Sequence, residues 1–341
     1  MDGRGQRGGT LARRRRERGD LEKGGTRGAR QAGPYHSCRY QPCQPGPASA
    51  PPRHPLSRHA HRLRVPPLSP RLGFGHVASR VKSAALEAIP VREVLEVSIH
   101  GASIDQCVEI CEEAVAARRH LTIGVVNAAK LVKMRSDRLL RDSVTGADLV
   151  VADGMAVVWA SRFLGQPLPG RVTGIDLFEA LLALADRRGL SVYLLGAAPD
   201  VLDALARQVR SDYPGARIAG QRDGYFSEDE AEQVAMDISA AKPDMLFVGI
   251  TTPKKEIFLE TWGPALDVAV CHGVGGSFDV MAGKTRRAPE SWQRNGFEWL
   301  WRIREEPGRM WKRYLVTNTW FIALVARDWV RIRFRKLRRS G

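Results

Sequence analysis

Short runs of β-branched residues alternate with longer amphipathic stretches from Val91 to about Arg286, and this alternation constrains the fold more than any other feature. A strand with one buried face buries every second residue, whereas a helix buries every third or fourth. The two kinds of run can therefore be distinguished in the sequence. Their alternation is typical of βαβ units. We therefore predict an α/β fold: a Rossmann-like, mostly parallel sheet flanked by helices, with a C-terminal helical appendage rich in Trp and Arg.

The elements follow from the same patterns. The predicted strands are Val94–Ile99, Leu121–Val126, Leu149–Ala152, Ser191–Leu195, Arg217–Gln221, Met245–Val248 and Val268–Cys271. The predicted helices are Ile104–Arg118, Ala128–Arg141, Ala156–Leu164, Ile175–Arg188, Pro199–Tyr213, Ser227–Ala241 and Pro253–Thr261, followed by further helices after Arg286.

Charge is distributed unevenly along the 341 residues. The formal net charge is +14 over residues 1–85, −7 over 86–298 and +9 over 299–341, for a total of +16. A nucleic-acid-binding domain normally carries its basic surface on the folded body, so we expect no nucleic-acid partner. We predict a disordered basic extension rich in Arg, Gly and Pro at 1–85, an α/β core at 86–290 and a helical membrane-proximal appendage at 291–341.

Cysteine usage and hydropathy bear on the compartment. The five cysteines are odd in number and too sparse for a disulfide framework, which favours reduced thiols and the cytoplasm. The longest uncharged, mostly apolar run is Tyr314–Ala326, which is too short to span a membrane. The N-terminal arginines are followed by no apolar h-region, so we expect no signal peptide.

Polar residues and glycines follow several predicted strands, where the ligands of open α/β sheets bind. Asn127 follows the second strand, Asp153 the third and Gly196 the fourth. Asp153 suits a general base, although an aspartate here also suits a helix N-cap. Asn127 suits either a contact to a substrate hydroxyl or amide, or another cap.

Two later segments favour anion binding. Pro253, Lys254, Lys255 and Glu256 follow the sixth strand, and a phosphate would explain lysines at a helix start, although solvated surface lysines would look the same. The turn Gly273–Asp279, with Gly275 and Gly276, can either cradle a diphosphate with its amides or serve only the backbone turn.

Carboxylates are not arranged for a divalent cation. No DxD pair ends a strand, and the acidic run Ser227–Glu232 is typical of a helix start with a capping box between Ser227 and Glu230. We expect no metal ion and no cofactor.

The C-terminal segment combines aromatic and basic residues. Five of the eight tryptophans and twelve basic residues fall within residues 299–341. This composition favours attachment to an anionic membrane surface over a helical hairpin that packs on the core.

Several motifs follow one another in order between residues 152 and 314. They are ADG (152–154), GRVTGIDL (170–177), LLGA (194–197), DGYF (223–226), PKKE (253–256), GVGGSFDVMAGKTRRAP (273–289) and FEWLWRIREEPGRMWKRY (297–314). Together they resemble the WecG/TagA/CpsF family of glycosyltransferases over roughly Val91 to Tyr314.

The resemblance implies transfer of an N-acetylmannosamine-type sugar from a UDP donor to a polyprenyl-diphosphate-linked sugar, in bacterial cell-surface polysaccharide synthesis. It implies an inverting, metal-independent enzyme, peripheral at the inner face of the membrane, with Asp153 as the base. The glycine-rich loop with Asp279, and Tyr225, would face the UDP. The residues expected on the sugar side of the site are Arg171, Thr173, Gly174 and Asp176. The residues expected to contact the diphosphate oxygens are Arg287, Arg302, Arg309 and Arg313.

Two positions depart from the family pattern. Lys255 stands where Gln is usual, and Val125 stands where Thr is frequent, which leaves donor and acceptor open. The alternatives are an NAD(P)-dependent Rossmann oxidoreductase, for which Ser98–Asp105 offers a single glycine, or a non-enzymatic basic membrane- or RNA-tethering protein. A homo-oligomer is left open.

Overall fold

The structure is a computed structural model that describes residues 83–294, 296–305 and 307–340. The extension predicted for residues 1–85 lies almost wholly outside the described residues. The strands are β1 Val91–Val94, β2 Val97–His100, β3 Leu121–Val126, β4 Leu149–Ala152, β5 Ser191–Gly196, β6 Arg217–Arg222, β7 Met245–Gly249 and β8 Val270–His272. The helices of the core are α1 Ala84–Ala88, α2 Ile104–Ala116, α3 Ala128–Lys133, α4 Arg138–Thr145, α5 Met155–Phe163, α6 Gly174–Arg188, α7 Pro199–Asp212, α8 Ala231–Ala241, α9 Lys254–Trp262 and α10 Ser277–Met281, with a 3₁₀ turn at Gly263–Ala265. The C-terminal helices are α11 Glu290–Arg294, α12 Glu298–Glu305 and α13 Pro307–Ser340.

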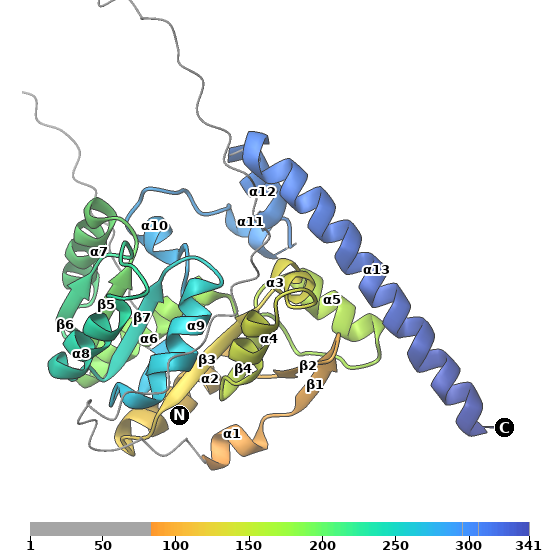
Figure 1. Cartoon of the computed structure of the whole chain (residues 1–341), viewed down its shortest axis with the longest axis horizontal. Helices are drawn as coiled ribbons and strands as arrows, with labels where there is room; N and C mark the ends of the chain where they lie inside the picture. Colours follow the sequence, from red (N-terminus) through yellow and green to blue (C-terminus); the bar gives the residue numbers. More distant parts are fainter. Residues whose placement is uncertain (1–82, 295, 306, 341) are drawn as a thin grey trace, which may run out of the picture. The chain divides into compact units, whose positions relative to one another are not determined.

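A six-stranded parallel sheet in the order β4-β3-β8-β7-β5-β6 forms the centre (Figure 1). Its inner strands carry buried apolar side chains almost throughout, because helices cover both faces. One face packs against α2, α6 and α7, and the other packs against α3, α4, α8 and α9. The predicted α/β class with a mostly parallel sheet is confirmed.

Two predicted elements are wrong in detail. The single strand expected at 94–99 is a hairpin of β1 and β2, because Leu95 and Glu96 turn the chain with φ of 53° and 64°. The helix expected at 128–141 is divided into α3 and α4, because the side chain of Asp137 accepts a hydrogen bond from the Leu140 amide and starts a new helix.

The capping box predicted between Ser227 and Glu230 forms, but it does not cap the first turn of the helix. Ser227 and Glu230 do exchange hydrogen bonds, with the Glu230 amide donating to Ser227 Oγ at 3.3 Å and the Ser227 amide donating to Glu230 Oε2 at 2.7 Å. The helix, however, begins at Ala231, so the box closes the turn that precedes α8.

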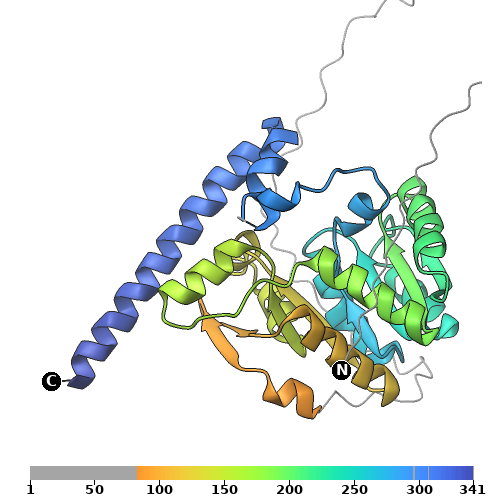
Figure 2. The ribbon, with the colours of Figure 1, turned by 180° about the vertical axis from the view of Figure 1, so that it is seen from behind.

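The C-terminal helices confirm the helical appendage. α13 lies along α3 and α5, as both views show (Figures 1 and 2). Phe321 and Val325 are buried in the same apolar cluster as α3 and α5. Among the described residues, no helix has the length and apolarity needed to cross a membrane.

Candidate active site

A crevice opens beyond the carboxyl ends of β3 and β8. The helix after β3 packs with α5 and α13, whereas the helix after β8, α10, packs on the opposite face against α6 and α7. Neighbouring strands whose following helices diverge leave such a crevice. A cavity of about 620 Å³ lies beside this point, at the carboxyl ends of β3 and β4, and Asn127 and Asp153 line it.

Asp153 faces this cavity from the end of β4. Its backbone N–H donates to the Val126 carbonyl at 2.7 Å, which holds it beside the end of β3. The N-terminus of α5 has Gly154 as its cap residue, with φ of 104° and no side-chain cap. The Asp153 carboxylate instead accepts a hydrogen bond from the Asn127 side chain. The helix-cap alternative for Asp153 is therefore wrong.

Asn127 fills both of the roles that its sequence position allowed. Its Oδ1 accepts a hydrogen bond from the Lys130 amide at 3.0 Å and so caps α3. Its side-chain amide donates to Asp153. Asn127 thus fixes the carboxylate while remaining exposed to the cavity.

Burial raises the pKa of Asp153 above its ordinary value. The opposing influences, in order of size, are the charge of Arg302, the charge of Lys130, the hydrogen bond from Asn127 and the charge of Arg171. They do not cancel the effect of burial. A carboxylate with a raised pKa is a stronger base, which suits proton abstraction near neutral pH.

Three predicted arginines line the same cavity. They are Arg171 from the segment before α6, Arg302 from α12 and Arg313 from α13. Arg171 pairs with Glu298 at 3.0 Å, so α12 is tied to the sheet edge by an ion pair. Glu298 was not foreseen, since one glutamate in a charged helix carries no distinguishing signal.

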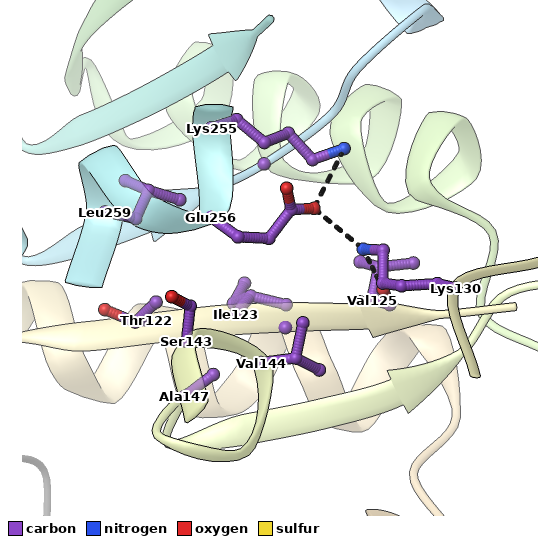
Figure 3. Close-up of a pocket in the computed structure, with 12 residues that line it drawn as sticks. Thr122, Ile123, Val125, Lys130, Ser143, Val144, Ala147, Lys255, Glu256 and Leu259 are labelled. Atoms are coloured by element: carbon purple, nitrogen blue, oxygen red, sulfur yellow. Dashed lines mark hydrogen bonds and ion pairs between the residues drawn. The ribbon is translucent and has the colours of Figure 1, made fainter. Parts of the chain in front are cut away.

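Lys130 of α3 and Glu256 and Lys255 of α9 form a buried ionic triad (Figure 3). Glu256 Oε1 lies 2.9 Å from Lys130 Nζ and 3.4 Å from Lys255 Nζ. All three side chains are buried, so the sequence alternative of a solvated surface lysine is wrong for Lys255. Burial lowers the pKa of Lys255, and the charge of Lys130 adds to this effect.

Glu256 holds two buried cations together, so Glu256→Gln is expected to destabilise the fold. Burial alone would raise the Glu256 pKa, but Lys130 and Lys255 outweigh burial and the pKa is lowered. Removing the charge leaves both lysines unpaired, which costs about 3–5 kcal/mol in comparable buried pairs. Urea unfolding at pH 7 measures the loss.

The pH dependence and a matched variant check the cause. Because the folded pKa of Glu256 is lowered, its contribution is present above the unfolded value near 4.5 and is lost as pH falls through the folded value. Glu256→Gln should therefore lack this acid-dependent part of the wild-type stability. Lys255→Gln leaves the Lys130 pair intact and should cost less. Equal losses in both variants would contradict the ionic explanation.

The start of α6 gathers four predicted residues. Thr173 caps the helix through a hydrogen bond from the Asp176 amide to its Oγ1 at 3.1 Å, and Gly174 begins the helix. The Asp176 carboxylate pairs with Arg287, which also lies 3.6 Å from Glu179. The Asp176–Arg287 pair therefore joins α6 to the segment after α10.

His272 ends β8 and was missed, because one histidine before a glycine-rich turn has no spacing signal. It is fully buried, and burial lowers its pKa to about 4, so its ring is neutral at pH 7. Since the Gly174 carbonyl can only accept, His272 Nε2 must carry the proton in their 3.3 Å contact. His272 thus fixes the start of α6 against β8.

Several backbone N–H groups of the glycine-rich loop already donate hydrogen bonds within the fold. The amides of Val274 and Gly275 both donate to the Val248 carbonyl, and the Ser277 amide donates to the Val274 carbonyl. These amides are therefore engaged within the fold, and the predicted cradle of free N–H groups is wrong for them. Gly275 has φ of 57°, and a Cβ there would lie 3.1 Å from Lys255 Nζ. Gly276 is exposed, and Asp279 lies in the short helix α10.

Gly196, Lys254 and Tyr225 do not line the cavity, and neither do the predicted residues at the start of α6, in the ionic triad and in the glycine-rich loop, or Arg287. Gly196 is required for packing, since its φ is 133° and a Cβ would lie 2.5 Å from the backbone of Gly249. Lys254 follows Pro253 and contacts the Phe226 carbonyl and ring. Tyr225 is 77% exposed. The side chain of Arg309 lies outside the described residues.

Within the part of the chain that the structure describes, acidic, cysteine and histidine side chains do not converge on one point. Over the described ranges 83–294, 296–305 and 307–340, no group of three or more His, Cys, Asp or Glu residues is placed to hold a metal ion. The cysteines that the structure describes are Cys107, Cys111 and Cys271, which are buried free thiols.

Sequence comparison gives consistent matches. Residues 92–335 match the family described as the glycosyl transferase WecG/TagA/CpsF family. An N-acetylglucosaminyldiphosphoundecaprenol N-acetyl-beta-D-mannosaminyltransferase of Bacillus spizizenii is 37% identical over 185 residues, which cover 54% of this chain and 71% of that protein. The protein with the same description in Bacillus subtilis is 36% identical over 193 residues, which cover 57% and 74%.

Proposed function

Because this chain belongs to the WecG/TagA/CpsF family of glycosyl transferases, we propose that it transfers an N-acetylmannosamine-type sugar from a UDP-sugar to a polyprenyl-diphosphate-linked acceptor. The transfer inverts the anomeric centre and uses no metal ion. The relatives act on a diphosphoundecaprenol-linked N-acetylglucosamine, as their descriptions say, and this is the acceptor class that we infer here.

The observation that carries this proposal is the placement of Asp153 in the cavity, with a raised pKa and a hydrogen bond from Asn127. The acceptor hydroxyl oxygen attacks the anomeric carbon of the donor sugar and forms the new glycosidic bond. The bond to the UDP oxygen breaks, and UDP leaves with its electron pair. Asp153 takes the hydroxyl proton as the attack proceeds.

Arginines offset the charge that develops on the departing diphosphate. Arg302 and Arg313 face the same cavity as Asp153, and guanidinium groups bind phosphate oxygens in bidentate fashion. Arg171 is already paired with Glu298, so it holds the appendage closed over the sheet edge. Lys255 pairs with Glu256 at 3.4 Å and does not line the cavity, so it is not among the cations that meet the diphosphate.

The appendage also supports a membrane location. The exposed side of α13 presents large apolar side chains, among them Trp311, Leu315, Val316, Trp320 and Phe334. Basic residues of α13 lie among them, as an interfacial helix on anionic lipid requires. We infer a cytoplasmic protein, peripheral at the inner face of the cell membrane, that acts in cell-surface polysaccharide synthesis.

The alternative functions have less support. An NAD(P)-dependent oxidoreductase needs a glycine fingerprint after its first strand, and here Ser103 caps α2 through a reciprocal box with Gln106. A tethering protein gives no reason for the paired Asn127 and Asp153 in a cavity.

The test is release of UDP from a panel of UDP-N-acetylhexosamines by the full chain, with EDTA present and a lipid-diphosphate-linked N-acetylglucosamine as acceptor. We expect release that depends on the acceptor and is greatest with the mannosamine donor. Product stereochemistry, read by the anomeric coupling in NMR, should show inversion. Folded protein that releases no UDP with any donor would refute the proposal.

A further inference from the structure

The cavity at Asp153 continues far beyond the reacting groups. It extends between α5 on one side and α13 on the other, and these two helices lie side by side in both views (Figures 1 and 2). Arg313 and Val325 both line it and lie twelve residues apart on α13, which is about 18 Å along the helix axis. The cavity is therefore a groove with an end at Asp153 and an end near Val325. We call it the α5–α13 groove.

The two ends of the groove differ in chemistry. Charged side chains lie at the Asp153 end, namely Asp153, Arg171, Glu298, Arg302 and Arg313. Thr317 and Asn318 follow on α13, and beyond them the α13 wall is apolar, with Phe321, Ile322, Val325 and Ala326. The facing wall on α5 is formed by Met155, Ala156, Trp159, Ala160 and Phe163.

The apolar walls are open rather than packed shut. Trp159 is 47% exposed, Phe163 57% and Ile322 65%, although all three line the groove. Phe163 stacks on Trp329 with ring centroids 5.6 Å apart, which bounds the groove on the side away from Asp153. Large apolar side chains gathered around an open cavity mark a ligand surface.

The groove selects an amphiphile. A nucleotide or a sugar alone would leave the apolar walls without an apolar partner. A hydrocarbon alone would leave the guanidinium groups without an anionic partner. A ligand with an anionic head and a long apolar tail matches both ends at once. The inferred acceptor has this form, because its sugar is joined through a diphosphate to a polyprenyl chain.

We propose that the α5–α13 groove binds the first isoprene units of the acceptor's polyprenyl chain. The diphosphate then meets Arg302 and Arg313, and the sugar hydroxyl faces Asp153. This inference rests on the proposed function, since it assigns a place to the tail of the same acceptor. The groove therefore makes the specificity of the enzyme depend on the lipid tail of the acceptor as well as on its sugar.

Two water-soluble acceptors test the proposal without a membrane. Both carry N-acetylglucosamine diphosphate, one with a prenyl tail of a few isoprene units and one with a methyl group. For the wild-type full chain, kcat/KM should be at least roughly tenfold higher with the prenyl acceptor, because the apolar surface of the prenyl tail leaves water when it enters the groove. Equal values for the two acceptors would overturn the proposal.

Variants locate the effect. Ile322→Asn and Phe163→Asn change exposed side chains of the groove and should bring the prenyl-to-methyl ratio of kcat/KM towards one. Leu139→Asn on α4, a 37% exposed side chain outside the groove, is the matched control and should keep the wild-type ratio. A ratio in the groove variants that stays at the wild-type value would also overturn the proposal.

Binding separates this inference from the function on which it rests. Quenching of tryptophan fluorescence gives the affinity for each acceptor without turnover. Preferential binding of the prenyl acceptor with no UDP release would support the groove and refute the proposed transferase. UDP release with both acceptors at equal efficiency would support the transferase and refute the groove.

Discussion

Asp153→Asn is expected to lower kcat by roughly 10²–10⁴-fold, the range that general acid–base catalysis supplies. Asparagine keeps the shape and the hydrogen bond to Asn127 but cannot accept a proton. UDP binding, measured by calorimetry, should remain close to wild type. Asp137→Asn is the matched control, because Asp137 caps α4 and asparagine caps equally well. A turnover rate for Asp153→Asn near that of wild type would remove Asp153 from the mechanism.

The pH profile gives the same residue an independent signature. Asp153 acts as a base only when ionised, so kcat/KM should rise as pH rises through its pKa and then level off. Burial has raised that pKa, and the charge of Arg302 is the largest influence that opposes the shift. Arg302→Gln should therefore move the rising limb to higher pH, in addition to lowering the plateau. A limb that stays in place would show that another group titrates.

Removal of the appendage should have the second large effect. A chain that ends at Arg294 lacks α12 and α13, and with them Arg302 and Arg313. We expect it to lose acceptor-dependent turnover, because neither Arg302 nor Arg313 remains to offset the charge on the leaving diphosphate. It should also no longer co-sediment with anionic vesicles. Activity and sedimentation, with a cooperative melt to confirm folding, measure these losses.

Two further proteins separate the causes. Arg302→Gln with Arg313→Gln in the full chain should still bind vesicles while losing turnover. A chain that ends at Val330 keeps every residue that lines the groove but lacks six basic residues, each worth about 1 kcal/mol near an anionic surface. This chain should bind vesicles less tightly and keep its turnover of soluble acceptors. Turnover by the chain that ends at Arg294 would show that the appendage is dispensable for chemistry.

Local patterns were sufficient for the elements of the core and for the residues at strand ends. Alternate burial in a strand and periodic burial in a helix are properties of a few consecutive residues, so β3, β4 and β7 were predicted to within a residue. The placement of Asp153 after a buried strand followed in the same way. The hairpin of β1 and β2 was missed because two non-glycine residues, Leu95 and Glu96, adopt a left-handed turn.

The sequence by itself determined an α/β chain of this family, with Asn127 and Asp153 at the ends of strands and a basic aromatic C-terminus. Only the tertiary structure decided what these residues do together, because their partners come from distant elements. The parallel pairing of β3 with β4 brings Asn127 to Asp153, and the buried triad joins Lys130 of α3 to α9. The α5–α13 groove exists because Phe321 and Val325 bury themselves against α3 and α5, a long-range packing choice that no local period encodes.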